Sequence, residues 1–363
     1  MARSSRRSRL RALGVAGAVV AALLLAACSG SSPQRSTPPS PTPSTSTNAS
    51  GDCTLSAKAV PSCGVLWGIA THPPTLKRLD QAQQAIGRQV DFVYRYHDVN
   101  DVVPDDAERK VVSEGKLLHI AIAARDFSSS TRGDITWAQV ASGQFDASLT
   151  AQAKGIASLK VPVFVTFEQE ASQKHKLAAL GTPDDFKAAW HHLHDLYVKA
   201  GTTNAVWTWV MTGSDDNLTS AGQLWPGNQY VDWISWNVYN QSGCKGNRIA
   251  MDKFVSFKDK MLIFYNWMRA EGPKIDMDTT KPIMISETGS AQYAGDLKAT
   301  ADWYAAIPSA LQQYPQIKAI GLWDSTDSYC NYDFTDVPDI ASGVREASLD
   351  PFLDLHGALK DAG

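Results

Sequence analysis

The stretch VPVFVTFEQEAS, residues 161–172, joins an apolar run to two carboxylates. The run from Val161 to Phe167 is typical of a buried β-strand, and Glu168 and Glu170 follow at its carboxyl end. Burying an unpaired charge is costly. Acidic residues at this point therefore indicate that the strand delivers them to a rim where chemistry is done.

Seven further β-rich runs alternate with helical patterns. We expect strands at 64–70, 90–97, 116–124, 161–169, 204–212, 231–239, 281–287 and 317–324, and long helices at 183–200 and 251–270. Thr182 and Pro183 form a typical helix start. Eight strands alternating with helices in about 300 residues predict one (β/α)8 TIM barrel. Because no glycine-rich phosphate loop follows the first strand, a dinucleotide-binding sheet is less favoured.

The segment KPIMISETGS, residues 281–290, supplies a second carboxylate. Glu287 ends the seventh expected strand, so it belongs to the same active-site rim as Glu170. Cleavage of a glycosidic bond uses such a pair: one carboxyl protonates the leaving oxygen while the other attacks the anomeric carbon or activates water. A separation of roughly 5–5.5 Å gives retention, and a wider one gives inversion.

Several motifs resemble glycoside hydrolase family 26, the β-mannanase family of a large clan of retaining (β/α)8 enzymes. They are Phe145-Asp146, AVWTWV at 205–210, LWPGNQYVDWISWNVYN at 224–240, and SETG at 286–289. The resemblance implies that Glu170 is the general acid/base and Glu287 the nucleophile. It implies that Tyr239 hydrogen-bonds the nucleophile. The implied substrate is a β-linked polysaccharide, β-mannan or a related β-glycan, and no cofactor is required.

The sequence departs from the family pattern beside the acid/base. Gln169 stands where the family usually has histidine, and the arginine three residues earlier is Thr166 or Phe167 here. We expect Gln169 to hydrogen-bond the sugar, as an amide does in related barrel families. These differences bear more on mannan specificity than on hydrolysis.

Other residues are assigned supporting parts. Trp323, at the end of the eighth strand, is a candidate floor for the sugar, although an ordinary core tryptophan fits nearly as well. Trp209 and Asn237 are weaker substrate-binding candidates. On an extended strand Glu168 lies about 6.6 Å from Glu170 on the same face. We therefore expect Glu168 to be a buried, paired support residue one layer deeper in the barrel.

The front of the chain is typical of an exported lipoprotein. Residues 1–28 carry five arginines, then an apolar stretch too short for an ordinary membrane span, and end at Leu25-Ala26-Ala27-Cys28. Cys28 is the expected lipidation site, with plain signal cleavage as the alternative. Residues 29–60 are rich in Ser, Pro and Thr and predict a disordered tether. Residues 61–363 then form a single catalytic domain outside the cytoplasm, lipid-anchored to the cell membrane.

Four further cysteines remain for the domain. An even number in an exported protein suggests disulfides, with free buried thiols as the alternative. Cys53 and Cys63 are close in sequence, which leaves Cys244 with Cys330.

Composition excludes some partners. A net charge of −3 and the absence of basic blocks argue against nucleic acid. Eleven each of Trp, Tyr and Phe suit flat sugar-binding surfaces. Neither the His191-His192-Leu193-His194 run nor the acid-rich segment 324–336 has the spacing of a metal site, so we assign no metal. The expected state is a monomer.

Two other functions stay open beside the glycoside hydrolase. One is a solute-binding lipoprotein of a transporter, which would have two lobes and no matched pair of glutamates. The other is a barrel that binds polysaccharide without cleaving it. Gln169, in place of the family's histidine, suggests this alternative.

The lipid anchor predicts a defined mature N-terminus. Mass spectrometry of the membrane-extracted protein should find a diacylglyceryl-modified Cys28, because that cysteine closes the apolar run. An unmodified start elsewhere would rule out the anchor.

Overall fold

The computed structural model describes residues 53–128, 133–244, 254–293, 296–326, 329–353 and 355. Eight parallel strands follow one another in chain order around a closed barrel, and the last pairs with the first. The strands are β1 (Leu66–Thr71), β2 (Phe92–Asp98), β3 (Leu117–Ala123), β4 (Val163–Phe167), β5 (Ala205–Thr212), β6 (Trp233–Asn240), β7 (Ile283–Ser290) and β8 (Ile317–Asp324). The predicted (β/α)8 barrel is confirmed.

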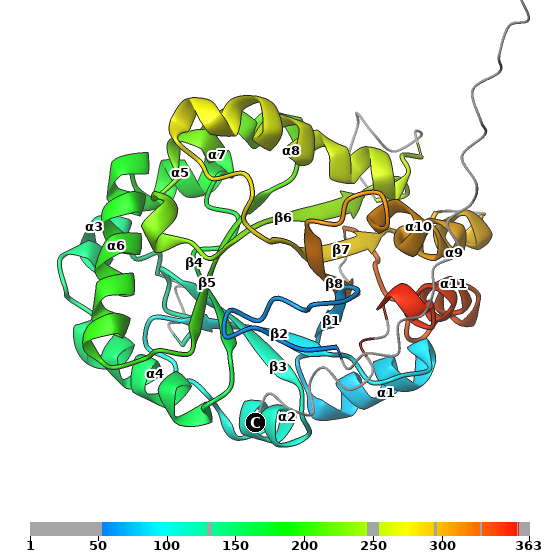
Figure 1. Ribbon diagram of the computed structural model, residues 1–363, viewed down its shortest axis with the longest axis horizontal. Coiled ribbons are helices and arrows are strands. Elements are labelled where there is room, and N and C mark those ends of the chain that lie inside the picture. Colours follow the sequence, from blue (N-terminus) through cyan, green and yellow to red (C-terminus); the bar gives the residue numbers. More distant parts are fainter. Residues whose placement is uncertain are drawn as a thin grey trace, which may run out of the picture. The chain divides into compact units, whose positions relative to one another are not determined.

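Helices form a ring around the strands (Figure 1). They are α1 (Leu76–Ile86), α2 (Asp106–Ser113), α3 (Trp137–Ala141), α4 (Asp146–Leu159), α5 (Lys174–Leu180), α6 (Pro183–Lys199), α7 (Leu218–Gln223), α8 (Phe257–Glu271), α9 (Leu297–Ala305), α10 (Ile307–Leu311) and α11 (Pro338–Ser348). Helix α6 begins as expected, with Thr182 in a capping box and Pro183 at its first position. Helix α8 begins at Phe257 rather than residue 251, because Ser256 caps it there.

One strand boundary matters for function. Strand β4 ends at Phe167, and the expected strand 161–169 is too long. Glu168 and Glu170 have φ angles of 48° and 55°, in the left-handed region. The chain therefore turns at the two acidic residues, and the alternation of an extended strand does not extend to them.

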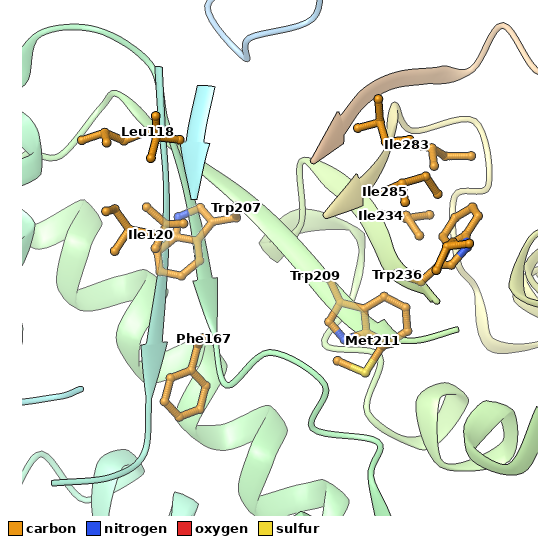
Figure 2. Close-up of a cluster of buried hydrophobic side chains, with 14 of the residues drawn as sticks. Leu118, Ile120, Phe167, Trp207, Trp209, Met211, Ile234, Trp236, Ile283 and Ile285 are labelled. Carbon is orange, nitrogen blue, oxygen red and sulfur yellow. The ribbon is translucent and has the colours of Figure 1, made fainter. Parts of the chain in front are cut away.

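Outward-facing side chains of the strands pack under the helices. Figure 2 shows part of this layer, including Trp209, Met211 and Trp236 on the neighbouring strands β5 and β6. Trp209 is 0% exposed and packs edge-on against Trp225 with ring centroids 5.1 Å apart. Trp209 thus belongs to the layer between barrel and helices.

Inward-facing side chains change character along the barrel. Near the strands' amino ends the interior is apolar, with Phe92, Phe164 and Trp233 in edge-on contact. Two residues further along, polar side chains such as Thr166 and Ser235 replace them, both fully buried. This gradient leaves the polar groups concentrated toward the carboxyl ends of the strands.

A disulfide-closed hairpin covers the amino end of the barrel. Cys53 and Cys63 are bonded, as predicted, and Ala59 packs fully buried into the apolar end of the interior. The indole of Trp233 donates to the Lys58 carbonyl at 2.8 Å. The packed domain thus starts at Cys53 rather than at residue 61, because residues 53–60 contribute to the core.

The second predicted disulfide is also present. Cys244 and Cys330 are bonded, with Cα atoms 4.4 Å apart. Cys244 follows β6 and Cys330 follows β8, so the bridge links the segments on either side of β7 at its carboxyl end. The bridge packs in a cluster with Tyr332, Tyr239 and Trp323.

The expected leader and lipidation site at Cys28, and the tether up to residue 52, lie outside the described residues. Across the described ranges, none of the helices combines the length and apolar character that crossing a membrane requires.

Replacing Cys244 and Cys330 together with serine should destabilise the barrel more than replacing Cys53 and Cys63. In the loop-entropy model, closing a loop with a sequence separation of 86 contributes about 4.6 kcal/mol, against about 2.7 kcal/mol for a separation of 10. Urea unfolding without reductant measures both. A larger loss for the amino-terminal pair would contradict the expected order.

Candidate active site

Glu287 reaches the barrel mouth through an irregularity in β7. The pairing of β7 with β8 shifts register between Ile285 and Thr288, and the pairing with β6 shifts between Trp236 and Val238. Ser286 hydrogen-bonds Ser235 in the interior, and the next side chain, Glu287, also contacts inward-facing groups. Consecutive residues on a regular strand face opposite ways, so this bulge is what directs the carboxylate into the barrel.

Three donors hold the Glu287 carboxylate. Tyr96 on β2 donates to Oε1 at 2.8 Å. Tyr239 and Asn237 on β6 donate to Oε2 at 2.7 and 2.8 Å. The expected bond from Tyr239 is confirmed. Glu287 is 5% exposed, so these donors replace the water that a carboxylate otherwise needs.

Glu170 lies in the turn after β4. Its backbone N–H donates to the Val210 carbonyl on β5 at 2.9 Å. Gln173 donates to its Oε2 at 2.6 Å. The amide of Asn237, which donates to Glu287, also favours the ionised form of Glu170 and so lowers its pKa. The two carboxyls are near enough for the charge of Glu170 to raise the pKa of Glu287.

The two carboxyls influence each other's protonation. Burial raises the pKa of Glu287, the negative charge of Glu170 raises it further, and the bonds from Tyr239 and Tyr96 oppose the rise. Burial also raises the pKa of Glu170, opposed by the charge of Lys176 and the bond from Asn237. Two like charges in one buried site disfavour double ionisation. The pair thus favours one ionised and one protonated carboxyl.

Gln169 bonds inside the protein. Its Oε1 accepts a hydrogen bond from the Tyr94 hydroxyl on β2, and Tyr94 stacks on His119 with ring centroids 3.8 Å apart. His119 contacts Thr166 at 2.8 Å, and that hydroxyl donates to the Thr208 carbonyl. His119 must then donate through Nε2, and its buried Nδ1 has no hydrogen-bond partner among the described residues. Burial lowers the pKa of His119 to about 3, so the ring is neutral.

Glu168 is buried and paired, as expected. It is 3% exposed, accepts a bond from the Ala124 N–H at 2.7 Å, and forms an ion pair with Lys176 at 2.7 Å. Its predicted place one layer deeper inside the barrel is wrong. Its partners are the end of β3 and helix α5, because the left-handed turn directs the side chain there.

The aromatic candidates separate into two groups. Trp323 is partly exposed and meets Tyr96 edge-on with centroids 5.8 Å apart, so it can line the mouth as expected. The assignment of Trp209 to substrate binding is wrong, because its indole is enclosed between barrel and helices.

Sequence reasoning missed Tyr94, Tyr96 and His119. For the two tyrosines the signal was the run YRYH at 94–97, because Tyr94 and Tyr96 share the inward face of their strand with Phe92. A cavity of about 170 Å³ is lined in part by Tyr96, Gln169 and Lys176.

No metal ligands gather in the described parts of the chain, where no group of three or more His, Cys, Asp or Glu side chains could hold an ion. Three of the acids in segment 324–336 instead surround one guanidinium. Arg78 of α1 pairs with Asp324, Asp333 and Asp336 at 2.9, 2.8 and 2.6 Å. This cluster anchors the segment that follows β8 and carries Cys330.

Known proteins share this fold. No family model matches the sequence. Endoglucanase H of Acetivibrio thermocellus is 23% identical over 287 residues, which are 76% of this chain but only 29% of that relative. The chain thus spans less than a third of the relative's length.

Solved structures give a closer picture. The catalytic domain of a glycoside hydrolase family 26 endo-β-1,4-mannanase from Bacillus sp. JAMB-750 is similar with a TM-score of 0.60 at 16% identity, over 82% of this chain and 90% of that one. A modular endo-β-1,4-mannanase from Cellulomonas fimi has a TM-score of 0.56 at 16% identity, over 80% and 71%. A family 26 β-mannanase from Bacteroides ovatus has 0.56 at 14%, over 80% and 90%. The chain has the fold of these mannanases.

Tyr96→Phe should raise the pKa of Glu287, because the hydroxyl stabilises the ionised carboxylate. Carboxyl-labelled glutamate followed by NMR titration measures the midpoint, assigned with Glu287→Gln. Tyr94→Phe is the matched control, since that hydroxyl bonds Gln169 instead. A midpoint that falls or stays in Tyr96→Phe would contradict the assigned bond.

Proposed function

We propose that this chain is a retaining glycoside hydrolase related to family 26 that cleaves a β-linked polysaccharide, β-mannan or a related β-glycan. The observation that carries the proposal is the buried Glu287 carboxylate, held by three donors at the mouth of the barrel, with Glu170 near enough for its charge to act on it. The fold shared with family 26 mannanases supports it.

The hydrogen bonds support one assignment of the two roles. Glu287 accepts three bonds, all from donors that favour its ionised form, so it serves as the nucleophile. Glu170 lies in a turn and serves as the general acid. An oxygen of Glu287 attacks the anomeric carbon while the bond to the leaving oxygen breaks and Glu170 gives that oxygen its proton.

The second step regenerates the enzyme. Glu170, now ionised, takes a proton from water as the water oxygen attacks the anomeric carbon, and the bond to Glu287 breaks. The partly exposed ring of Trp323 can carry the apolar face of the sugar. The step needs no cofactor.

A second candidate function is binding without cleavage. The observation that favours it is the bond between Tyr94 and Gln169, which engages the carbonyl oxygen of the amide expected to hold the sugar. The two-lobed architecture of a solute-binding protein is not what the described residues form, since they build one closed barrel.

We also propose that the enzyme works outside the cytoplasm, anchored through Cys28. The amino-terminal sequence supports this location, and so do the two disulfides, which persist in oxidising compartments.

Activity can be tested directly. The purified domain should release reducing sugar from at least one of a panel of mannans, β-glucans and xylans. NMR of the first-formed product should show the anomeric configuration of the substrate. An inverted product would remove the retaining mechanism, and binding of a panel member without any release would favour the second candidate.

Variants of the two glutamates should behave differently. Glu170→Ala should lose about 10²–10⁴-fold on substrates with poor leaving groups. Activated aryl glycosides should remain substrates, and added azide should restore turnover because it attacks the glycosyl-enzyme in place of water and needs no general base. Glu287→Ala should abolish retaining turnover of both substrate kinds.

The exposed Glu346→Ala on α11 is the matched control and should resemble the wild type. If Glu168→Ala, in a folded protein, gave the leaving-group pattern instead of Glu170→Ala, the assignment of the acid/base would be wrong.

A further inference from the structure

Lys176 holds the turn that carries the acid/base. Its ammonium pairs with Glu168 Oε1 at 2.7 Å and also donates to the carbonyl oxygen of Gln169. The lysine side chain is 21% exposed and that of Glu168 is 3% exposed. We call these three residues, Glu168, Gln169 and Lys176, the Lys176 clamp.

The clamp acts on a turn that opposes its own backbone preference. A residue other than glycine in the left-handed region costs on the order of 1 kcal/mol, and both Glu168 and Glu170 adopt it. Such conformations persist only where surrounding contacts determine them. The Glu168 N–H donates to the Ile122 carbonyl at 2.8 Å, while its carboxylate accepts from Ala124 and Lys176. The clamp thus ties the turn to β3 and α5.

Lys176 also acts through its charge. It lowers the pKa of Glu170 and that of Glu287, against the rise caused by burial. Besides Lys176 and its carboxylate partner Glu168, the titratable groups near the pair include His175, Tyr94, Tyr96 and Tyr239. Tyr94, Tyr96 and Tyr239 are neutral donors, and His175 is exposed. Lys176 is therefore the fixed cation of the site.

We propose that Lys176 is a positioning residue for the reaction, which fixes the turn bearing Glu170 and holds a positive charge beside the two glutamates. The inference rests on the proposed function and names the residue on which its acid/base depends. It gives a physical reason why a lysine on a seven-residue helix is held against the two residues that precede Glu170.

Three variants separate the charge of Lys176 from its packing. Lys176→Met keeps much of the apolar stem and removes the charge. Lys176→Arg keeps the charge. Lys174→Met removes an exposed lysine from the same helix and is the matched control.

The readout is the titration of Glu170 and Glu287 by carboxyl-labelled NMR, followed by the pH profile of kcat/KM. In Lys176→Met both midpoints should rise by roughly 0.5–1 pH unit, because a nearby cation favours the ionised form. The acidic limb of kcat/KM should move to higher pH, and kcat should fall at least about tenfold through misplacement of Glu170. Lys176→Arg should restore the midpoints, and Lys174→Met should match the wild type.

Midpoints of Lys176→Met that coincide with the wild type would overturn the inference, whatever the loss of rate. If Lys176→Met does not fold, Glu168→Gln decides. It leaves the lysine charge without its carboxylate partner, so both midpoints should fall, and unchanged midpoints would overturn the inference. If the wild-type protein cleaves none of the mannans, β-glucans and xylans, the proposed function is wrong. If the wild type is active but the titration midpoints of Lys176→Met are unchanged, only this inference is wrong.

Discussion

Repulsion between two carboxylates confined to one buried site is the constraint on which the active-site end of this barrel depends. Glu287 is 5% exposed, and the negative charge of Glu170 raises its pKa. Water is largely excluded, so donors from β2 and β6 must replace its solvation. Polar groups gather toward the carboxyl ends of the strands, while the amino end of the barrel interior is apolar. These polar groups supply the hydrogen bonds that water would otherwise give to the carboxylates. The disulfide between Cys244 and Cys330 then restrains the segments that flank β7.

Much of the architecture could be predicted because it depends on short-range patterns. Apolar runs alternating with amphipathic stretches were enough for eight strands, and the carboxyl-end rule placed Glu170 and Glu287 at one rim. The two cysteine pairings followed from spacing and elimination. Each of these inferences uses a periodicity or a distance along the chain.

The errors arose where the backbone leaves its regular period. The left-handed turn at Glu168 and Glu170 leaves no sequence signal as a glycine would, and it directs Glu168 to the end of β3 and to Lys176 of α5. Trp209 and Trp323 both lie on strands. The direction in which each side chain points, toward the helices or toward the barrel mouth, decides which of them can contact a sugar. Tyr96 was overlooked because its partner, Glu287, is 191 residues away in the chain.

The hairpin closed by Cys53 and Cys63 marks the amino-end face of the barrel. It contacts Trp233 at the very start of β6, whereas Glu287 lies near the end of β7. Because all eight strands run parallel, Cys53 lies at the amino-end face of the barrel and the two glutamates lie at the carboxyl-end face. The first described residue and the candidate active site are therefore on opposite faces of the barrel.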